Sequence, residues 1–429
     1  MSITSSMYNG AAGLGSHSEA MGVISDNIAN VNTVGFRSSR ANFADVLGGM
    51  LAGSRTGAGS MIGSVQTMFE SGSLLGTGNA TDLAIQGNGF FVVHGAVNGI
   101  ESNYYTRAGQ FQVDENGFLV NPDGLRVQGY GLTGSGSLGT TPGDLQIDTG
   151  TLPPVATTSV AVDANLDAAQ AIDPTAFDIN DPGATSDYST SVTVYDSLGS
   201  PHQLTMFFKK LADAPTQQWE VHVAAAGADV QPPAASDYTE ITSGTLDFDT
   251  AGALTASSLG AVNVPWSGAA AGAITLDLGT PTGSGGSGTD GITAYAGDSA
   301  ASGLTQDGAG SGELADFEIQ PDGTIEGRYS NGQTRALGQV ATATFANVDG
   351  LQRQGNSLFT ATARSNDPVV GVAGTDGHGS IVAGALEGSN VDLAQEFVTM
   401  IAVQRGFQGN SRTISTADEM LTDIVSLKR

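Results

Sequence analysis

The C-terminal stretch SNVDLAQEFVTMIAVQRGFQGNSRTISTADEMLTDIVSL, residues 389–427, decides how this chain is organised. Its opening residues Ser389, Asn390, Val391 and Asp392 are typical of a helix start, because a short polar side chain accepts from a free backbone N–H and an acid suits the first turn. A first apolar column then recurs every seven residues: Leu393, Met400, Phe407, Ile414 and Leu421. A second, partly polar column follows three residues behind it: Glu396, Val403, Asn410, Ala417 and Ile424. This spacing predicts one long helix with an apolar seam.

The N-terminus carries a second segment long enough to lie beside that helix. Met7, Leu14, Met21 and Ile28 are also seven residues apart, which predicts a helix from about residue 5 to residue 30. The two helices could simply pair and close the fold, or they could also pack on other copies of the chain. Residues 1–40 contain only two basic and two acidic residues, so the charged edges of an isolated coiled coil are missing. We therefore predict that the N-terminal column and the first column of the C-terminal helix form the contact between subunits.

Composition excludes several classes of function. The chain has 429 residues, enough for two to four domains, and a net charge of -28. Its 15 basic residues are scattered, which argues against a nucleic-acid partner. There is no cysteine for disulfide or thiol chemistry, and no apolar run is long enough to span a membrane. The first 20 residues lack the pattern of a cleaved signal peptide, so export would need another route.

The sequence predicts a multidomain fold in which a terminal α-helical, coiled-coil-like domain accompanies mainly β domains. From residue 82 the apolar period changes to two, and Asn-Gly and Asp-Gly turn signals separate the runs. Similar signals return after residue 312. We expect a helical domain over 1–37 and 386–429, an extended connector over 38–80, a split β domain over 81–160 and 313–385, and an inserted outer β domain over 161–312. Within the insertion, residues 267–312 are rich in Gly, Ala, Ser and Thr and are expected to be loop.

Motifs at both ends of the chain carry a family resemblance. The N-terminal run NIANVNTVGFR spans residues 27–37, and the C-terminal runs GSNVDL and QRGFQGNS begin at residues 388 and 404. Together they resemble the signatures of the bacterial flagellar axial proteins, which include rod, hook and hook-associated proteins. The matching residues are Asn27, Asn30, Asn32, Thr33, Gly35, Phe36, Ser389, Asn390, Val391, Asp392, Leu393, Gln404 and Arg405. The run TVYDSLGSPH, residues 193–202, resembles the central domain of hook members in particular.

Gly406 and Gly409 depart from the family pattern, which more often has Ala there. Each Gly costs about 0.5–1 kcal/mol in a helix interior, so we expect a more pliable C-terminal helix.

The resemblance implies a non-enzymatic hook subunit without cofactors that polymerises with its own copies into a curved, flexible tube. It implies further partners in the rod, the hook–filament junction proteins, the hook cap and the flagellar type III export apparatus. The location would be the extracellular hook of the flagellum. A distal rod protein is the nearest alternative, and a secreted β-domain adhesin or hydrolase is the alternative from another class. Two heptad-spaced ends argue against the last, since such a protein has no use for assembly helices.

Three patterns that suggest chemistry are weak. Gly134–Gly139 has dinucleotide-binding spacing, but no helix is expected after it to bind the phosphates. Gly285–Ile292 fits a single calcium β-roll repeat, whereas such rolls need several stacked copies. The five histidines show no metal-ligand spacing. We therefore predict no catalytic, cofactor or metal site.

Overall fold

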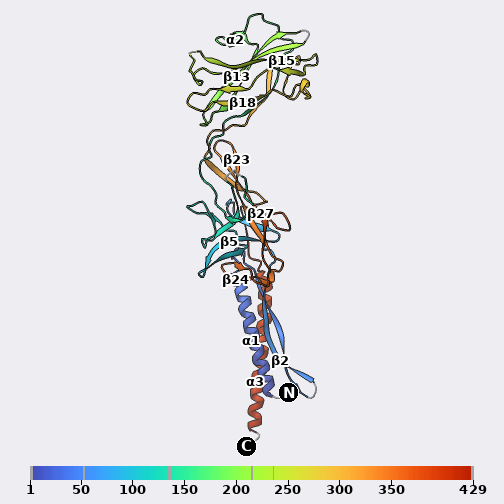
Figure 1. Ribbon diagram of the computed structural model, residues 1–429. Helices are drawn as coiled ribbons and strands as arrows, with labels where there is room; N and C mark the ends of the chain where they lie inside the picture. The colour runs from blue at the N-terminus through green and yellow to red at the C-terminus, as the bar shows by residue number, and fades with distance from the viewer. Residues whose placement is uncertain (1–2, 52–53, 134–136, 214–215, 235, 427–429) are drawn as a thin grey trace. The chain divides into compact units, whose positions relative to one another are not determined.

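The structure, a computed structural model, describes residues 3–426 apart from residues 52–53, 134–136, 214–215 and 235 (Figure 1). The chain forms two compact units. The first comprises Met1–Thr149, Asp316–Gly327 and Thr334–Arg429, and the second comprises Gly150–Ala315 and Arg328–Gln333. Helices at the two ends of the chain flank a mainly β body, which confirms the predicted fold class.

The two terminal helices lie side by side in the first unit (Figure 1). α1 spans Ile3–Ala29 and α3 spans Leu393–Ser426. α3 begins directly after Asp392, whose Oδ1 accepts hydrogen bonds from the backbone N–H groups of Ala394 (2.9 Å) and Gln395 (3.3 Å). The carboxylate therefore caps the helix where the sequence pattern predicts its start.

The first apolar column is not the buried centre of the helix pair. Ala20 and Ile24 of α1 form a buried cluster with Val403 of α3, and Ala417 is also buried. Val403 and Ala417 belong to the second column. In the first column, Leu393 is 39% and Phe407 38% exposed. The other members of this column and all members of the N-terminal column are half-buried: Met400, Ile414, Leu421, Met7, Leu14, Met21 and Ile28.

Glycines allow the two helix backbones to approach closely. A Cβ on Gly13 would lie 2.5 Å from Asn410 Nδ2, and a Cβ on Gly406 would lie 2.5 Å from His17 Cε1. A Cβ on Gly409 would meet nothing within 4 Å. Gly406 thus makes room for a side chain of the partner helix, whereas no packing contact requires Gly409.

The segment 38–80, expected to be an extended connector, contains a long β-hairpin instead. β1 (Ser39–Leu51) pairs antiparallel with β2 (Ser54–Thr67), and both strands pack on α1. Register shifts within β1 and glycines in β2 break the alternation of apolar and polar residues, which concealed these strands in the sequence. Further along, β3 (Leu74–Gly76) pairs with β28 (Ala385–Glu387). This pairing joins the segment that follows the hairpin to the segment that leads into α3.

The β part of the first unit is built from both sides of the insertion. Its main sheet contains β5 (Phe90–Val97), β6 (Ile100–Thr106), β7 (Gln112–Val113), β8 (Leu119–Val120), β9 (Arg126–Gly131), β10 (Gly143–Asp144), β21 (Leu314–Ile319), β22 (Thr324–Tyr329), β23 (Thr334–Thr344), β24 (Gln352–Gly355), β25 (Leu358–Thr360) and β26 (Val369–Val372). β23 pairs with both β5 and β9, so the two halves share hydrogen bonds. β4 (Leu83–Gln86) pairs with β27 (Ser380–Ala383), and η2 (Val348–Gly350) is a short 3-10 turn. Phe90, Tyr105 and Phe359 lie in an aromatic core.

The second unit holds two five-stranded sheets around one core. One sheet has the order β12 (Tyr188–Tyr195), β13 (Pro201–Ala212), β14 (Gln217–Ala226), β15 (Tyr238–Phe248), β16 (Leu254–Ser257). The other contains β11 (Ser159–Asn165), β17 (Val262–Val264), β18 (Gly272–Asp277), β19 (Ile292–Thr293) and β20 (Ala300–Gln306). α2 (Pro182–Thr185) and η1 (Thr282–Ser284) are short turns. Trp219, Phe208 and Phe248 are completely buried in the core.

Two sequence expectations for this unit need correction. The boundary drawn between residues 160 and 161 falls inside β11, and the unit begins at Gly150. Residues 267–312, expected to be loop, contain β18, β19 and β20, and their Ile274 and Ile292 are buried. Each of the short strands β18 and β19 places an isoleucine in the core, although the surrounding segment is rich in glycine.

Candidate assembly surface and helix junction

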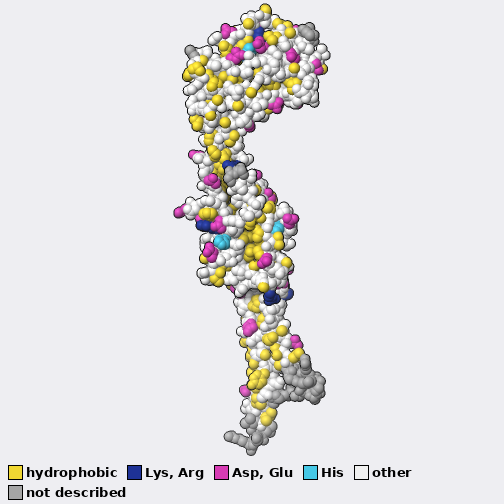
Figure 2. All heavy atoms as spheres, viewed as in Figure 1, with side chains coloured by type: hydrophobic (Ala, Val, Ile, Leu, Met, Phe, Trp, Pro, Cys, Tyr) yellow, Lys and Arg dark blue, Asp and Glu magenta, His cyan; other side chains and the backbone are white. Residues whose placement is uncertain are grey.

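α3 exposes apolar side chains that an isolated chain does not bury. Figure 2 shows hydrophobic side chains along the helical part of the first unit. Val398 is 62% exposed, Phe397 and Ile401 are each 50% exposed, and Met420 and Ile424 are each 53% exposed. The heptad columns missed Phe397, Val398 and Ile401. The signal that could have found them is that the helix is apolar on more than one side, which is typical of a helix buried all round.

The hairpin adds a second exposed apolar surface. Phe43 and Leu47 of β1 are 47% and 59% exposed, and Met61 and Val65 of β2 are each 54% exposed. Phe43 is opposite Ile62 and Met61 is opposite Ala44, so Phe43 and Met61 lie on different faces of the hairpin. Exposed apolar side chains of this kind are typical of surfaces that bind another protein. The columns predicted for the subunit contact lie next to these residues, and their role in assembly stays a prediction.

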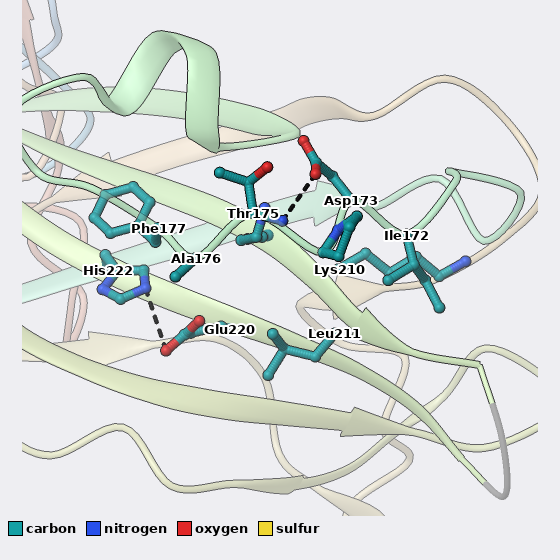
Figure 3. Close-up of a pocket in the computed structure, with 11 residues that line it drawn as sticks. Ile172, Asp173, Thr175, Ala176, Phe177, Lys210, Leu211, Glu220 and His222 are labelled. Atoms are coloured by element: carbon teal, nitrogen blue, oxygen red, sulfur yellow. Dashed lines mark hydrogen bonds and ion pairs between the residues drawn. The ribbon is translucent and has the colours of Figure 1, made fainter.

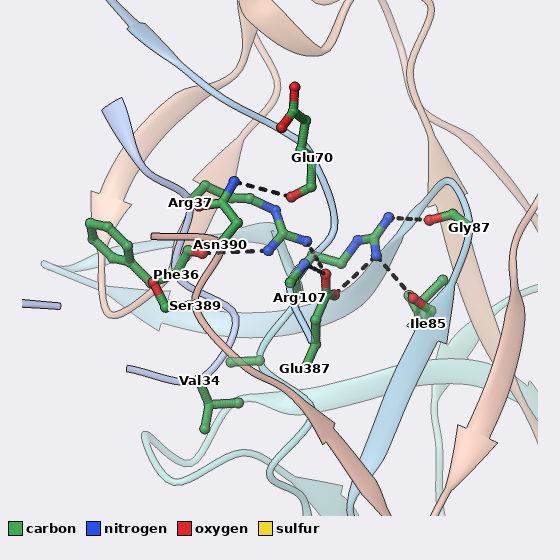
Figure 4. A network of polar contacts seen from close by, with 12 residues as sticks. Val34, Phe36, Arg37, Glu70, Ile85, Gly87, Arg107, Glu387, Ser389 and Asn390 are labelled. Atoms are coloured by element: carbon green, nitrogen blue, oxygen red, sulfur yellow. Dashed lines mark hydrogen bonds and ion pairs between the residues drawn. The ribbon is translucent and has the colours of Figure 1, made fainter. Parts of the chain in front are cut away.

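A buried ion-pair network lies where the helical part meets the sheet (Figure 4). Glu387, at the end of β28, is completely buried. Its Oε1 accepts from Arg37 Nη2 at 2.7 Å, and its Oε2 accepts from Arg107 Nη1 at 3.0 Å. Burial lowers the pKa of the Arg107 guanidinium and the charge of Arg37 adds to this, while Glu387 opposes it. Two buried cations thus share one carboxylate.

Backbone groups add to this network, although Arg37 Nε and Arg107 Nε have no hydrogen-bond partner within the described residues. Arg107 donates to the carbonyl oxygens of Ile85 (3.1 Å) and Gly87 (2.6 Å). The Glu387 carboxylate also accepts from the backbone N–H of Gly72 at 2.9 Å, and the Glu387 carbonyl accepts from that of Gly35 at 2.8 Å. The residues that follow α1, precede α3 and begin the sheet are therefore held at one point. Sequence reasoning missed Arg37, Arg107 and Glu387 as a group because they are far apart in the chain.

Several signature residues hold the backbone around this junction. Asn27 exchanges two hydrogen bonds of 2.8 Å with the backbone of Ser39 and donates to Glu396 Oε1 at 2.9 Å. Asn390 Oδ1 accepts from the Ser38 N–H at 2.7 Å, and its Nδ2 donates to Met68 O at 2.9 Å. These amides tie the ends of the helices to the hairpin.

The other signature residues divide into two groups. Gly35 has a positive φ of 67°, a conformation that favours glycine, and Phe36 is buried under the Arg353 guanidinium at 4.8 Å. Thr33 Oγ1 donates to Asn30 Oδ1 at 3.1 Å, and Ser389 Oγ accepts from the Val391 N–H at 3.3 Å. In contrast, Asn32, Gln404 and Arg405 are exposed, and within the described residues no side-chain hydrogen bond or ion pair holds them.

The second unit has a pocket of 380 Å³ beside its first sheet (Figure 3). Phe177 stacks on His222 with ring centroids 3.8 Å apart, and His222 lies between Glu240 (2.8 Å) and Glu220 (3.4 Å). Lys210 Nζ contacts Asp213 Oδ1 at 2.6 Å and donates to Ala168 O at 2.6 Å. Lys210 and His222 Nδ1 have hydrogen-bond partners, whereas within the described residues the buried His222 Nε2 makes no hydrogen bond and has only the 3.4 Å contact with Glu220.

The three weak chemical motifs gain no support. Among the described residues, no group of three His, Asp or Glu side chains could hold a metal ion. In the Gly285–Ile292 loop, Asp290 Oδ1 accepts from the Thr280 backbone N–H at 2.9 Å. Residues 134–136 of the Gly134–Gly139 stretch lie outside the described residues. No helix within the described ranges is long and apolar enough to cross a membrane.

Comparisons with known proteins define the class of this fold. Four family models match: the flagella basal body rod protein model over residues 7–37, the flagellar hook protein FlgE/F/G D1 domain over 84–165, the flagellar basal body protein FlaE D2 domain over 165–309, and the flagellar basal body rod FlgEFG protein C-terminal model over 382–427. All four models describe flagellar basal body or hook proteins, and their matches fall in both terminal segments and in the β body between them.

Full-length relatives narrow the class further. The flagellar hook protein FlgE of Escherichia coli is 35% identical, over 97% of this chain and 98% of its own length. That of Borreliella burgdorferi is 35% identical over 99% of both chains. The crystal structure of Helicobacter pylori flagellar hook protein FlgE2 shares the fold, with a TM-score of 0.51 and 18% identity over 72% of this chain and 98% of that one. The chain belongs to the flagellar hook protein FlgE family.

Proposed function

We propose that the chain is a structural subunit of the flagellar hook that polymerises with its own copies into a curved, flexible tube. The tube links the rod to the filament and transmits motor torque as a universal joint. The observation that carries the proposal is the exposed apolar surface of α3 and the hairpin, which an isolated subunit leaves in contact with water. The family relationship supports the same function.

A single substitution tests the assembly surface. Phe407 is 38% exposed, so Phe407→Glu leaves the fold intact in the free chain. In a polymer the new carboxylate would be buried without a partner, which is costly. We expect a folded monomer that forms no tubes. Gln408→Glu, at the neighbouring exposed position, is the matched control and keeps assembly.

Electron microscopy reads out the tubes, and circular dichroism checks the fold. Normal tubes from Phe407→Glu would show that this face of α3 is not a subunit contact.

The proposal includes partners and a route. The subunit would contact rod proteins, hook–filament junction proteins and the hook cap. It would leave the cell through the flagellar type III export apparatus without a cleaved signal peptide and reside in the extracellular hook. Its function requires no catalytic residue or cofactor.

A distal rod protein is the second candidate, because the two terminal family models are shared with rod proteins. The match of residues 165–309 to a separate D2 domain favours a hook subunit. Microscopy of the purified polymer separates the two candidates, because a hook tube is curved and a rod is straight.

A further inference from the structure

A pocket of 260 Å³ opens in the first unit between the two terminal helices and β1. Exposed Gln395 and half-exposed Phe43 lie at its wall, so it is open to solvent. Its other apolar lining residues come from α1, α3, β1 and the residue after β2: Ala20, Val23, Ile24, Val403, Ala41 and Met68. Seven of its thirteen lining residues are apolar, and the other six are polar or charged.

Glu396 is the one carboxylate among the lining residues. It is half-buried and accepts a hydrogen bond from Asn27 Nδ2 at 2.9 Å. Burial raises the pKa of Glu396, and the charge of Asp392 adds to this. Arg40 also lines the pocket, but it donates to Gln66 Oε1 at 3.1 Å, and no cation among the described residues pairs with Glu396. A carboxylate in an apolar wall is unfavourable unless a cation neutralises it.

The opposite face of α3 offers such a cation. Arg405 follows Glu396 by nine residues, which is about 180° around an α-helix of ~3.6 residues per turn. Arg405 is exposed and makes no ion pair within the described part of the chain. Ile401 and Val398, one and two turns before it, are 50% and 62% exposed. We call Val398, Ile401 and Arg405 the Arg405 ridge.

We propose that the Arg405 ridge of one copy docks into the pocket of the next copy and that Arg405 pairs there with Glu396. The inference rests on the proposed polymerisation. Apolar Val398 and Ile401 match the apolar wall, and the guanidinium matches the carboxylate, which it can bind through two parallel hydrogen bonds. Because ridge and pocket lie on opposite faces, the contact joins unlike surfaces and can be repeated from one copy to the next, as a helical polymer requires.

Cysteine cross-linking of assembled tubes tests the contact, since the chain contains no cysteine of its own. Glu396→Cys chains are mixed with Arg405→Cys chains, polymerised and oxidised. We expect disulfide-linked dimers from the mixture and none from either variant alone. A chain with both substitutions should give a ladder of multimers. It cannot form the bond internally, because nine helical residues rise about 13.5 Å and a disulfide needs Cα atoms within about 7 Å.

The matched control is Arg412→Cys, one heptad further along the same face of α3. Its mixture with Glu396→Cys should give no dimer. The proposal is overturned if the Arg412→Cys mixture gives disulfide-linked dimers. It is also overturned if tubes that contain both Arg405→Cys and Glu396→Cys chains give no disulfide-linked dimers. If these variants do not assemble alone, they are added as minor components to wild-type chains before oxidation.

A charge test works without oxidation. Glu396→Gln and Arg405→Gln should each raise the critical concentration for assembly on the order of tenfold, and the double variant by no more than one of them. Additive effects of the two substitutions would contradict a direct pair. If the wild-type chain itself forms no tubes, the proposed function fails, and that outcome is distinct from tubes that form but do not cross-link.

Discussion

Asn27, Asn390 and Glu387 each hold backbone from distant parts of the chain at one place. Asn27 ties α1 to the start of the hairpin, and Asn390 ties the approach to α3 to the end of the same hairpin. Glu387 forms ion pairs with Arg37 and Arg107. Removing a buried carboxylate that pairs with two cations lowers the stability of a protein strongly, because the cations are left buried without an opposite charge. The net stabilisation that the pairing itself provides is smaller. At the residue scale, the helices are therefore positioned by polar contacts as well as by apolar packing.

Glu387→Gln tests this network. The substitution preserves the shape of the side chain but leaves two buried guanidiniums without an opposite charge. We expect the free energy of unfolding of the first unit to fall by about 3–5 kcal/mol, the usual cost of breaking a buried pair. Urea denaturation followed by circular dichroism measures it. Glu101→Gln, at an exposed site, is the control and should change little. An unchanged midpoint for Glu387→Gln would mean that backbone contacts alone hold the junction.

At the scale of elements, the sequence was sufficient for the helices but not for their faces. Seven-residue spacing located α1 and α3, but it did not show that Val403, rather than Phe407, is buried between the helices of one chain; the role of the Phe407 column in the subunit contact stays a prediction. Column counting gives no weight to Gly10 and Gly13, although these glycines create the surface on which Asn410 and Ile414 pack. The hairpin remained hidden because its alternation is broken by bulges. The Arg37–Glu387–Arg107 network depends on the tertiary fold, so no local pattern could show it.

Two glycines in α3 give a matched pair of substitutions. Gly409→Ala meets no neighbour within 4 Å and should stabilise the helix by about 0.5–1 kcal/mol. Gly406→Ala gains the same propensity, but its new Cβ would lie 2.5 Å from His17 Cε1, and His17 is itself packed on Phe43 at 5.3 Å. We expect a net loss of stability.

Thermal unfolding of both variants measures the difference, and adding His17→Ala to Gly406→Ala should restore stability. If Gly406→Ala alone stabilises the chain as Gly409→Ala does, the contact with His17 does not constrain the helix pair.

At the scale of the whole molecule, the two units differ in composition. Residues 161–312 hold eighteen acidic residues but only two basic ones, Lys209 and Lys210. Lys210 pairs with Asp213, but two lysines against eighteen acidic residues leave this segment strongly negative. The exposed apolar side chains of α3 and the hairpin lie in the first unit. This division suits a subunit in which one part holds copies together and the other part resists tight contact.

Removal of the second unit tests what it contributes to a hook. Residues 150–315 are replaced by a short glycine linker between Thr149 and Asp316, a cut that removes β11 whole, unlike one at residue 161, and takes Leu314 and Ala315 from the start of β21. The pairing of β23 with β5 and β9 lies in the first unit, so this unit should still fold and polymerise. The turn at residues 328–333 loses the bond from Asn331 to Gly310 O, so circular dichroism must confirm the fold.

We expect straight tubes from this variant. A curved tube needs neighbouring subunits to take several relative positions, and we attribute the bias among them to weak contacts between acidic surfaces, which like charges keep from tightening at low salt. Without those surfaces, the apolar contacts of α3 and the hairpin alone set one relation between copies. Negative-stain microscopy measures the curvature, with wild-type tubes prepared in parallel. Cells with the variant should build filaments but swim poorly. Curved tubes from the variant would place the bending in the contacts of the first unit.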